Sequence, residues 1–315
     1  MSIEPAPQGN QLLIGEIRRA IERAGGRIPF RDYMELALYH PGHGYYASGR
    51  QRVGRRGDFL TSPHVSPLFA ECLARFIGSG PVLELGPGDG LLGRQLAPRF
   101  EYVAVDRGQA LPDAFEATVI SNELLDALPV HRLIRDQERY VRSDFSEELG
   151  PYSTPRLEEY FARLGLQPAG EAEVNLDTLD LMSAVYARLA KGQVLTIDYG
   201  YEAAELFVGH PQGTFLTYER HTADADPYVR IGEKDMTAHV DFTSLMALGE
   251  ASGLHTVTFT TQADFLADLG LGELLVSAQA AATDASAYAA LRQAAIGLLD
   301  PSGLGGFRVL VQQKG

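Results

Sequence analysis

A glycine-rich turn beside an acidic residue is the part of the sequence best suited to chemistry. The run from Val82 to Gly90 reads VLELGPGDG. Its first residues predict a strand, and residues 89–96 predict a helix, so the glycines lie where a strand passes into a helix. A helix N-terminus offers unpaired N–H groups and the positive end of a dipole, and glycine lets the backbone approach a ligand closely. The turn therefore predicts a nucleotide-binding site in a doubly wound α/β domain.

The spacing of these glycines distinguishes between nucleotides. The dinucleotide fingerprint requires glycine where this chain has Leu91. The observed pattern is instead E-x-G-x-G-x-G, the form used by S-adenosylmethionine-dependent methyltransferases, and it is made by Glu84, Gly86, Gly88 and Gly90. S-adenosylmethionine is therefore the expected cofactor, with S-adenosylhomocysteine as its product. A nicotinamide-dependent oxidoreductase and a turn with a purely structural role are the alternatives.

Polar residues also end the other predicted parallel strands. Asp106 ends a short second strand 20 residues after Gly86, where a carboxylate can accept both ribose hydroxyls. Asn122 and Glu123 follow a third strand, and Asp198 ends a fourth. Ligands of open α/β sheets bind at the carboxyl ends of the strands, so these residues predict one shared site. Strand ends are often polar merely because they are exposed, which is the structural alternative.

Three residues are candidates for the methyl-transfer chemistry. Glu123 follows the strand whose end faces the transferred methyl group in such folds, so it could hold a cationic acceptor or remove its proton. Asp126 lies three residues later and would share a helical face with it, and two carboxylates there suit a guanidinium. His221, in the irregular region 218–241, is a candidate general base or substrate contact, as is His239. Alternatively, Asp126 is only an acid in the first turn of a helix, and both histidines are ordinary surface residues.

Composition limits the classes of function. The chain has 315 residues and a formal net charge of −14, which disfavours nucleic acid and anionic membrane surfaces as partners. Cys72 is the single cysteine and lies in an apolar helical run, as a buried structural thiol would. We find no zinc-type ligand spacing, signal peptide or apolar run of membrane-spanning length, and therefore expect a cytoplasmic protein without a metal.

The order of predicted elements indicates one core with additions. Residues 1–70 are expected to form an N-terminal helical extension and a cofactor-covering loop, and residues 71–315 the core, with an inserted α+β element at about 135–190. Continuous apolar strands favour a parallel sheet, and residues 255–260 and 307–312 suit an antiparallel hairpin at its edge. Four arginines between residues 50 and 56 either hold an anion or belong to a solvated loop.

Six motifs follow one another in an order that resembles one known family. They are Gly57-Asp58-Phe59 with Thr61-Ser62-Pro63, the Glu84–Gly90 turn, Ser121-Asn122-Glu123 with Asp126–Val130, Asp198-Tyr199-Gly200, Gly213 with Tyr218 and His221, and Asp235 with Thr237–Phe242. The set resembles the MidA family of class I methyltransferases. That family includes a mitochondrial assembly factor that methylates an arginine of a respiratory complex I subunit.

The resemblance implies a Rossmann-like methyltransferase fold, with a mostly parallel, seven-stranded type of sheet and an antiparallel edge. It implies cofactor contacts at Gly57, Asp58, Phe59 and Thr61, at the glycine turn, at Asn122 and Glu123, and at Asp198, together with a protein substrate. A respiratory-complex subunit is one such substrate, and the oligomeric state is left open.

The chain departs from the family between Asp106 and Ala117, where only ten residues replace a longer helix and a third strand whose end helps bracket the adenine. The family also favours Glu at the positions of Asp106 and His64. A non-catalytic assembly or interaction factor with the same fold is therefore the main alternative to an arginine methyltransferase.

Overall fold

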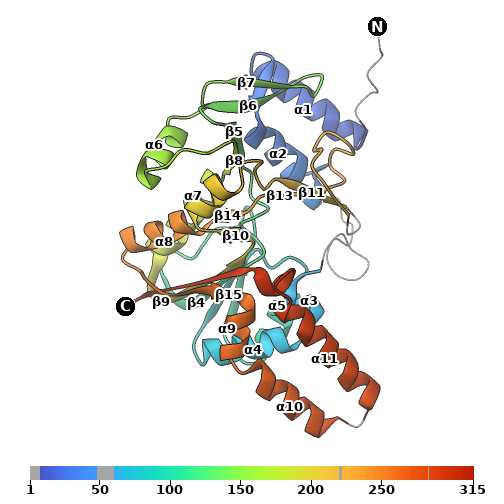
Figure 1. Ribbon diagram of the computed structural model, residues 1–315, viewed down its shortest axis with the longest axis vertical. Helices are drawn as coiled ribbons and strands as arrows, with labels where there is room; N and C mark the ends of the chain where they lie inside the picture. The colour runs from blue at the N-terminus through green and yellow to red at the C-terminus, as the bar shows by residue number, and fades with distance from the viewer. Residues whose placement is uncertain (1–7, 48–59, 220–221, 283) are drawn as a thin grey trace. The chain divides into compact units, whose positions relative to one another are not determined.

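The computed structural model describes residues 8–47, 60–219, 222–282 and 284–315. The chain divides into two compact units whose segments alternate along the sequence (Figure 1). The first unit comprises residues 1–52, 126–180 and 201–244, and the second comprises residues 53–125, 181–200 and 245–315. The expected boundary at residue 70 and the expected insertion at 135–190 stay predictions.

A six-stranded sheet forms the centre of the second unit. Its strands are β2 (Val82–Leu85), β3 (Tyr102–Val105), β4 (Phe115–Asn122), β9 (Leu189–Asp198), β15 (His255–Thr261) and β16 (Arg308–Lys314). They lie in the order β15-β16-β9-β4-β2-β3 (Figure 1). Strands β3, β2, β4 and β9 are parallel, whereas β16 is antiparallel to both β9 and β15. The expected Rossmann-like, mostly parallel sheet with an antiparallel edge is confirmed.

The helices of this unit pack on the sheet through one hydrophobic core. They are α3 (Ser62–Val65), α4 (Leu68–Ile77), α5 (Leu91–Leu96), α9 (Gln262–Asp268), α10 (Leu271–Ala281) and α11 (Ala285–Leu299), with a short turn η3 (Leu304–Gly306). Ile120 of β4 and Leu195 of β9 belong to this core together with residues of α4, α9 and α11. Burial of these apolar residues is the main force that holds the helices on the sheet.

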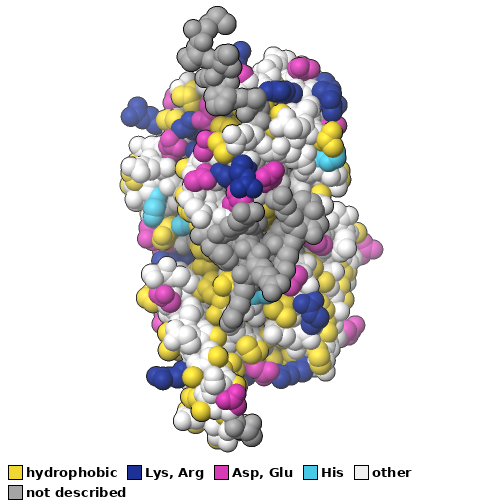
Figure 2. Space-filling model, turned by 90° about the vertical axis from the view of Figure 1, so that its right-hand side faces the viewer, with side chains coloured by type: hydrophobic (Ala, Val, Ile, Leu, Met, Phe, Trp, Pro, Cys, Tyr) yellow, Lys and Arg dark blue, Asp and Glu magenta, His cyan; other side chains and the backbone are white. Residues whose placement is uncertain are grey.

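Helices α10 and α11 form a hairpin that keeps apolar side chains on its surface. Val276 of α10 is 67% exposed and Ile296 of α11 is 47% exposed. Figure 2 shows hydrophobic side chains gathered on this hairpin, at the lower end of the view. No helix in the described ranges is both long and apolar enough to cross a lipid bilayer.

Strand β3 is the edge of the sheet in the described part of the chain. Residues 106–114, which connect it to β4, contain neither helix nor strand, and β3 pairs with β2. The side chain of Val103 is 45% exposed as a result. This connection of nine residues is therefore too short to supply the third strand of the seven-stranded type, as the short segment between Asp106 and Ala117 predicts.

The first unit contains an antiparallel sheet with helices and two smaller sheets. Its five-stranded sheet has the order β1-β6-β5-β8, with β7 paired to β6. Residues of both faces of this sheet enter separate hydrophobic clusters. The bounds are α1 (Gln11–Arg23), β1 (Arg27–Pro29), α2 (Phe30–Tyr39), η1 (Tyr45–Ala47), β5 (His131–Ile134), β6 (Gln137–Arg142), β7 (Glu147–Gly150), α6 (Arg156–Leu164), β8 (Glu171–Val174), β10 (Gly200–Tyr201), η2 (Glu205–Gly209), β11 (Leu216–Glu219), β12 (Thr222–Asp224), β13 (Asp235–Thr237) and β14 (Val240–Asp241). Helices α7 (Leu176–Arg188) and α8 (Phe242–Ala251) begin in this unit and continue into the second, and Gly200 of β10 also belongs to the second unit.

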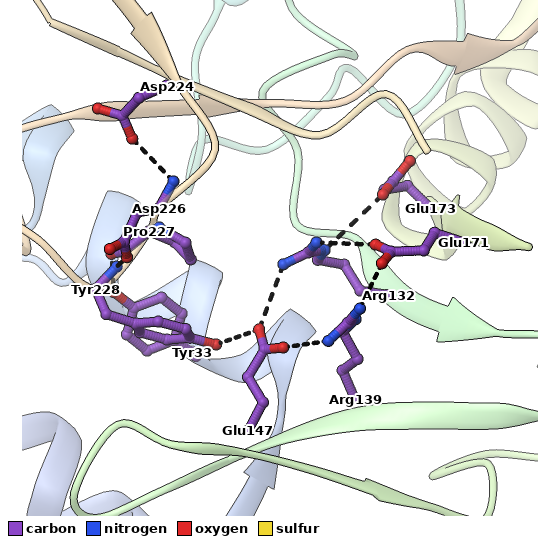
Figure 3. A network of polar contacts seen from close by, with 10 residues as sticks. All are labelled: Tyr33, Arg132, Arg139, Glu147, Glu171, Glu173, Asp224, Asp226, Pro227 and Tyr228. Carbon is purple, nitrogen blue, oxygen red and sulfur yellow. Dashed lines mark hydrogen bonds and ion pairs between the residues drawn. The ribbon is translucent and has the colours of Figure 1, made fainter. Parts of the chain in front are cut away.

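A network of ion pairs crosses this five-stranded sheet (Figure 3). Arg132 lies 3.4 Å from Glu147 and 3.3 Å from Glu171, and Arg139 pairs with the same two carboxylates. Tyr228 donates a hydrogen bond to Glu147 at 2.9 Å, beside an open cavity of about 660 Å³. Because each guanidinium already has two carboxylate partners from other strands, we interpret the network as a stabilising link between strands.

Candidate functional site

The glycine turn after β2 has a backbone that side chains would disfavour. Gly86, Gly88 and Gly90 have φ angles of +61°, +55° and +75°, in the left-handed region that favours glycine. The N–H of Gly86 donates to the carbonyl oxygen of Val105 at 2.9 Å, and the N–H of Gly90 donates to that of Pro87 at 2.8 Å. A Cβ atom added to Gly88 would meet no protein atom within 4 Å. The turn is thus held from within and open on the side where a ligand can approach.

Asp106 lies beside this turn, as its spacing predicts. The parallel pairing of Leu85 with Val105 brings the ends of β2 and β3 together, and Asp106 is the next residue. Its carboxylate is exposed and accepts the N–H of Arg107 at 2.7 Å, while its own N–H donates to Gln109 at 3.0 Å. The position suits a carboxylate that binds the hydroxyl groups of a ribose, and this role stays a prediction.

Glu84 places a buried carboxylate directly before the turn. Its side chain lies in β2 and the residue is only 4% exposed. Burial, and after it the charge of Asp89, raises the pKa of Glu84 to about 7. Its Oε2 atom is buried without a hydrogen-bond partner in the described residues, as is Oδ1 of Asn122. Unpaired buried oxygens are costly, so this end of the sheet is arranged for a ligand that carries N–H or O–H groups.

Glu123 follows β4 in a strained conformation. Its φ angle is +52°, although it is not a glycine, and such backbone strain costs on the order of 1–3 kcal/mol and tends to occur at functional sites. Oε1 of the half-buried side chain accepts hydrogen bonds from the N–H of Ser62 at 2.9 Å and from Nδ2 of Asn122 at 3.1 Å. Burial is the main cause that raises the pKa of Glu123 to about 8.

Asp198 holds the loop that carries Glu123. The residue is fully buried at the end of β9. Its Oδ2 accepts the N–H groups of Leu124 at 3.2 Å and of Leu125 at 2.8 Å, and its Oδ1 accepts the N–H of Tyr199 at 2.9 Å. These bonds join the end of β9 to the turn after β4, while a direct contact of Asp198 with the cofactor stays a prediction.

The structure gives a place in the site to two residues that the sequence named only as part of a motif (Ser62) and as a departure from the family (His64). His64 of α3 contacts Thr61 through Nδ1 at 2.8 Å and Asp89 of the glycine turn through Nε2 at 3.1 Å. Ser62 contributes the backbone N–H that binds Glu123. The Thr-Ser-Pro run indicates a helix start, but no local pattern shows which residue its N–H groups face.

Other predicted site residues either lie outside the described residues or belong to the first unit. Gly57, Asp58, Phe59 and His221, with the arginines of residues 50–56, lie outside the described residues. Asp126 belongs to the first unit, where it is 5% exposed and its carbonyl oxygen accepts the N–H of Ala238 at 2.9 Å. His239 is in the same unit, and burial, followed by the nearby His210, lowers its pKa to about 4.

Comparison with known proteins decides the family. Residues 94–260, more than half of the chain, match the model of the family described as "Putative S-adenosyl-L-methionine-dependent methyltransferase". The chain belongs to this methyltransferase family. A protein of Burkholderia thailandensis, described as a "likely methyl transferase" and bound to S-adenosylhomocysteine, is 31% identical, with a TM-score of 0.87 over 96% of this chain and 92% of that one.

Curated relatives of this methyltransferase are more distant. The protein arginine methyltransferase NDUFAF7 homolog, mitochondrial, of Drosophila melanogaster is 26% identical over 79% of this chain and 72% of its own. The NDUFAF7 protein of Homo sapiens is 24% identical over 79% of this chain and 71% of its own. The MidA resemblance and the S-adenosylmethionine cofactor are thereby confirmed, in preference to a nicotinamide cofactor.

The residues of this methyltransferase fit S-adenosylmethionine. Its amino acid part carries an ammonium group, for which the unpartnered Oε2 of Glu84 is a suitable acceptor. The open, left-handed glycine turn leaves space against which a ligand can lie, and glycine N–H groups suit a carboxylate. Asp106 offers an exposed carboxylate for the ribose. The ammonium, the carboxylate and the ribose of the cofactor thus have matching chemistry in the second unit.

We expect the replacement Glu84→Gln to remove a pH-dependent loss of stability. The native pKa of Glu84 lies above its value of 4.5 in the unfolded chain, so its stabilising effect is complete below about pH 4.5 and is lost as pH rises through about 7. The loss amounts to about 2–3 kcal/mol between pH 5 and pH 8.

Urea unfolding of the ligand-free protein at pH 5 and at pH 8 measures this loss of stability. The difference between the two free energies of unfolding should be smaller in the variant by about the same 2–3 kcal/mol. Equal differences in the variant and the wild type would show that the pKa of Glu84 is not raised in the native state.

Proposed function

We propose that this methyltransferase methylates an arginine side chain of a protein. The observation that carries the proposal is the carboxylate of Glu123, half-buried at the end of β4 and held through Oε1 by Ser62 and Asn122. The names of the Drosophila and human relatives support the same acceptor. The exact protein, including the respiratory-complex subunit expected from the family, stays a prediction.

A carboxylate of this kind suits a guanidinium for two reasons. It accepts N–H hydrogen bonds and so can orient the nitrogen that receives the methyl group. The bound cofactor supplies that methyl group on a positively charged sulfur. A guanidinium brought next to Glu123 would lower the pKa of the carboxyl from about 8, because an opposite charge favours the ionised form. Glu123 would then be ionised and able to take the proton that the nitrogen loses.

The first unit contains buried acids and tyrosines that also suit a cationic side chain. Asp126 and Asp235 are 5% and 3% exposed. Tyr46 donates to the carboxylate of Asp235, at 3.0 Å and 3.1 Å to its two oxygens. Burial, and with it the charges of both aspartates, raises the pKa of Tyr46 and of Tyr218. Carboxylates beside aromatic rings are the surroundings that guanidinium groups prefer. The role of Asp126 as a substrate contact stays a prediction.

The acceptor can be tested without knowing the substrate. Protein extract from cells that lack this enzyme would be incubated with the purified protein and with S-adenosylmethionine that carries a deuterated methyl group. We expect mass spectrometry to find the label on arginine side chains and not in a reaction without enzyme. Label confined to another side chain or to small molecules would contradict the proposal. The cytoplasmic location expected from the sequence stays a prediction.

A further inference from the structure

We propose that His64 is a positioning residue that fixes the glycine turn against the start of α3 and thereby sets the affinity of the enzyme for its cofactor. The proposal concerns S-adenosylmethionine and is independent of the methyl acceptor. It is carried by the contacts of the imidazole with two segments of the second unit, each of which reaches the residues assigned to the cofactor.

The imidazole of His64 bridges two short side chains with both of its nitrogens. Nδ1 lies 2.8 Å from Oγ1 of Thr61, and Nε2 lies 3.1 Å from Oδ2 of Asp89. A neutral ring satisfies both contacts when Nε2 donates to the carboxylate and Nδ1 accepts the threonine hydroxyl. The imidazole is 15% exposed and the Asp89 side chain is 48% exposed, so the ring is shielded from water while the carboxylate that it contacts stays partly open to solvent. The ring therefore links two segments of the chain through both of its nitrogens.

One end of this bridge lies inside the glycine turn. Asp89 stands between Gly88 and Gly90, and its Oδ1 accepts the N–H of Leu91 at 3.0 Å. Asp89 also contributes to the raised pKa of Glu84, which shows that its charge is felt at that carboxylate. A shift of Asp89 would therefore change both the course of the turn and the charge next to Glu84.

The other end of the bridge lies at the start of α3. Thr61 immediately precedes Ser62, whose N–H donates to Oε1 of Glu123 at 2.9 Å. Ser62 is fully buried, and its hydroxyl donates to Gln262 at 3.0 Å, so this end is anchored in the core. His64 consequently ties the turn after β2 to an anchored segment that also holds the loop after β4.

Arg94 contacts the same aspartate but does not tie the glycine turn to another segment of the chain. Its NH1 donates to the carbonyl oxygen of Asp89 at 2.7 Å, and its NH2 lies 3.7 Å from the carboxylate. Arg94 belongs to α5, which continues directly from the turn, and its side chain is 61% exposed. It therefore moves with the turn, whereas His64 connects the turn to a segment 25 residues away in the sequence.

Replacing His64 with each of the two amide residues tests its contact with Asp89 separately from its contact with Thr61. In His64→Gln the amide nitrogen can reach the place of Nε2 and keep the bond to Asp89. In His64→Asn the amide reaches only the place of Nδ1, so the link to Thr61 is kept and the link to the turn is lost. His255→Asn is the matched control, because His255 is an exposed histidine on β15 of the same unit.

Calorimetric titration of the full chain with S-adenosylhomocysteine measures the effect. We expect His64→Asn to raise the dissociation constant about threefold to tenfold, which is less than the full loss of a hydrogen bond to a charged group because the ligand contacts themselves are kept and only the turn is less well fixed. His64→Gln and His255→Asn should bind like the wild type. Hydrogen exchange of the ligand-free protein should quicken at the amides of residues 88–91 in His64→Asn and stay unchanged in the other two.

A double-mutant cycle of His64→Asn with Asp89→Asn tests this bond from both of its ends. The two changes together should have an effect on affinity that is smaller than the sum of the single effects, because both residues act through one bond. If His64→Asn folds poorly, Asp89→Asn alone keeps the test, because it weakens the same bond from the side of the turn and should also raise the dissociation constant, and wild-type affinity in it would contradict the proposal. Wild-type affinity in His64→Asn, or additive effects in the cycle, would overturn the proposal. A wild-type protein that binds no S-adenosylhomocysteine would instead contradict the cofactor assignment and the proposal with it.

Discussion

Valine in place of Gly88 should reduce the affinity for S-adenosylhomocysteine by about 100-fold or more, which corresponds to about 3 kcal/mol. A side chain at this position would meet no protein atom within 4 Å of its Cβ, so it would extend into the space left for the ligand. The backbone adds strain, because a β-branched residue at φ +55° is a strong outlier. The fold should survive, since the added atoms displace nothing in the protein.

Gly253→Val is the matched control for this prediction. Gly253 has a φ angle of +83°, its Cβ would also meet nothing within 4 Å, and it belongs to the same unit. The control therefore has a comparable backbone strain without a side chain in the cofactor site. We expect both variants to lose similar stability in thermal unfolding and only Gly88→Val to lose binding in calorimetry. Similar affinities in the two variants would remove the glycine turn from the cofactor site.

The replacement Glu123→Gln should lower the rate of methyl transfer by about 10²-fold to 10⁴-fold, the usual range for the loss of a general base. Glutamine keeps an oxygen that can accept the N–H groups of Ser62 and Asn122, so the loop should keep its conformation. It cannot take a proton from the acceptor nitrogen. The affinity for S-adenosylhomocysteine should therefore change little, and the effect should lie in kcat.

The pH profile gives this prediction its second measurement. The pKa of Glu123 is about 8 in the ligand-free protein, so the ionised, base-competent form makes up half of the enzyme near pH 8 and levels off above that pH. In the wild type, the rate of label transfer at a low concentration of the protein substrate should rise with pH in the same way. In Glu123→Gln the rate should no longer rise with pH. Glu116→Gln, which changes an exposed acid on the same strand, should behave like the wild type. Wild-type rates in Glu123→Gln would show that this carboxylate is not the base.

The parts of the site that the sequence predicted are those with a local signature. The glycines of residues 86–90 need a particular spacing, and Asp106, Asn122 and Asp198 directly follow apolar strands, so short patterns were enough to bring them to one edge of the sheet. The antiparallel pairing of β15 with β16 was predictable from the similar length of the two strands and from the position of β16 after the last helices.

The parts of the site that the sequence could not predict depend on contacts between residues far apart in the chain. Asp89 and His64 are 25 residues apart, Ser62 and Glu123 are 61 apart, and Leu124 and Asp198 are 74 apart. Nothing in the local sequence indicates that Glu123 adopts a positive φ, because that conformation is imposed by the bonds at both ends of its loop. The division into two units is also not visible in the sequence, because the segments where the chain passes from one unit to the other do not have the composition of a linker.

The alternation of the two units has a consequence for how this enzyme can fold during synthesis. The chain passes between the units five times, after residues 52, 125, 180, 200 and 244. Within the second unit, β16 lies between β9 and β15, although it follows both in the sequence. The sheet that carries the cofactor site therefore stays incomplete on the ribosome until residues 308–314 have emerged, and a chain cut before them would leave β15 without its neighbour. No single cut of the chain can therefore separate the two units.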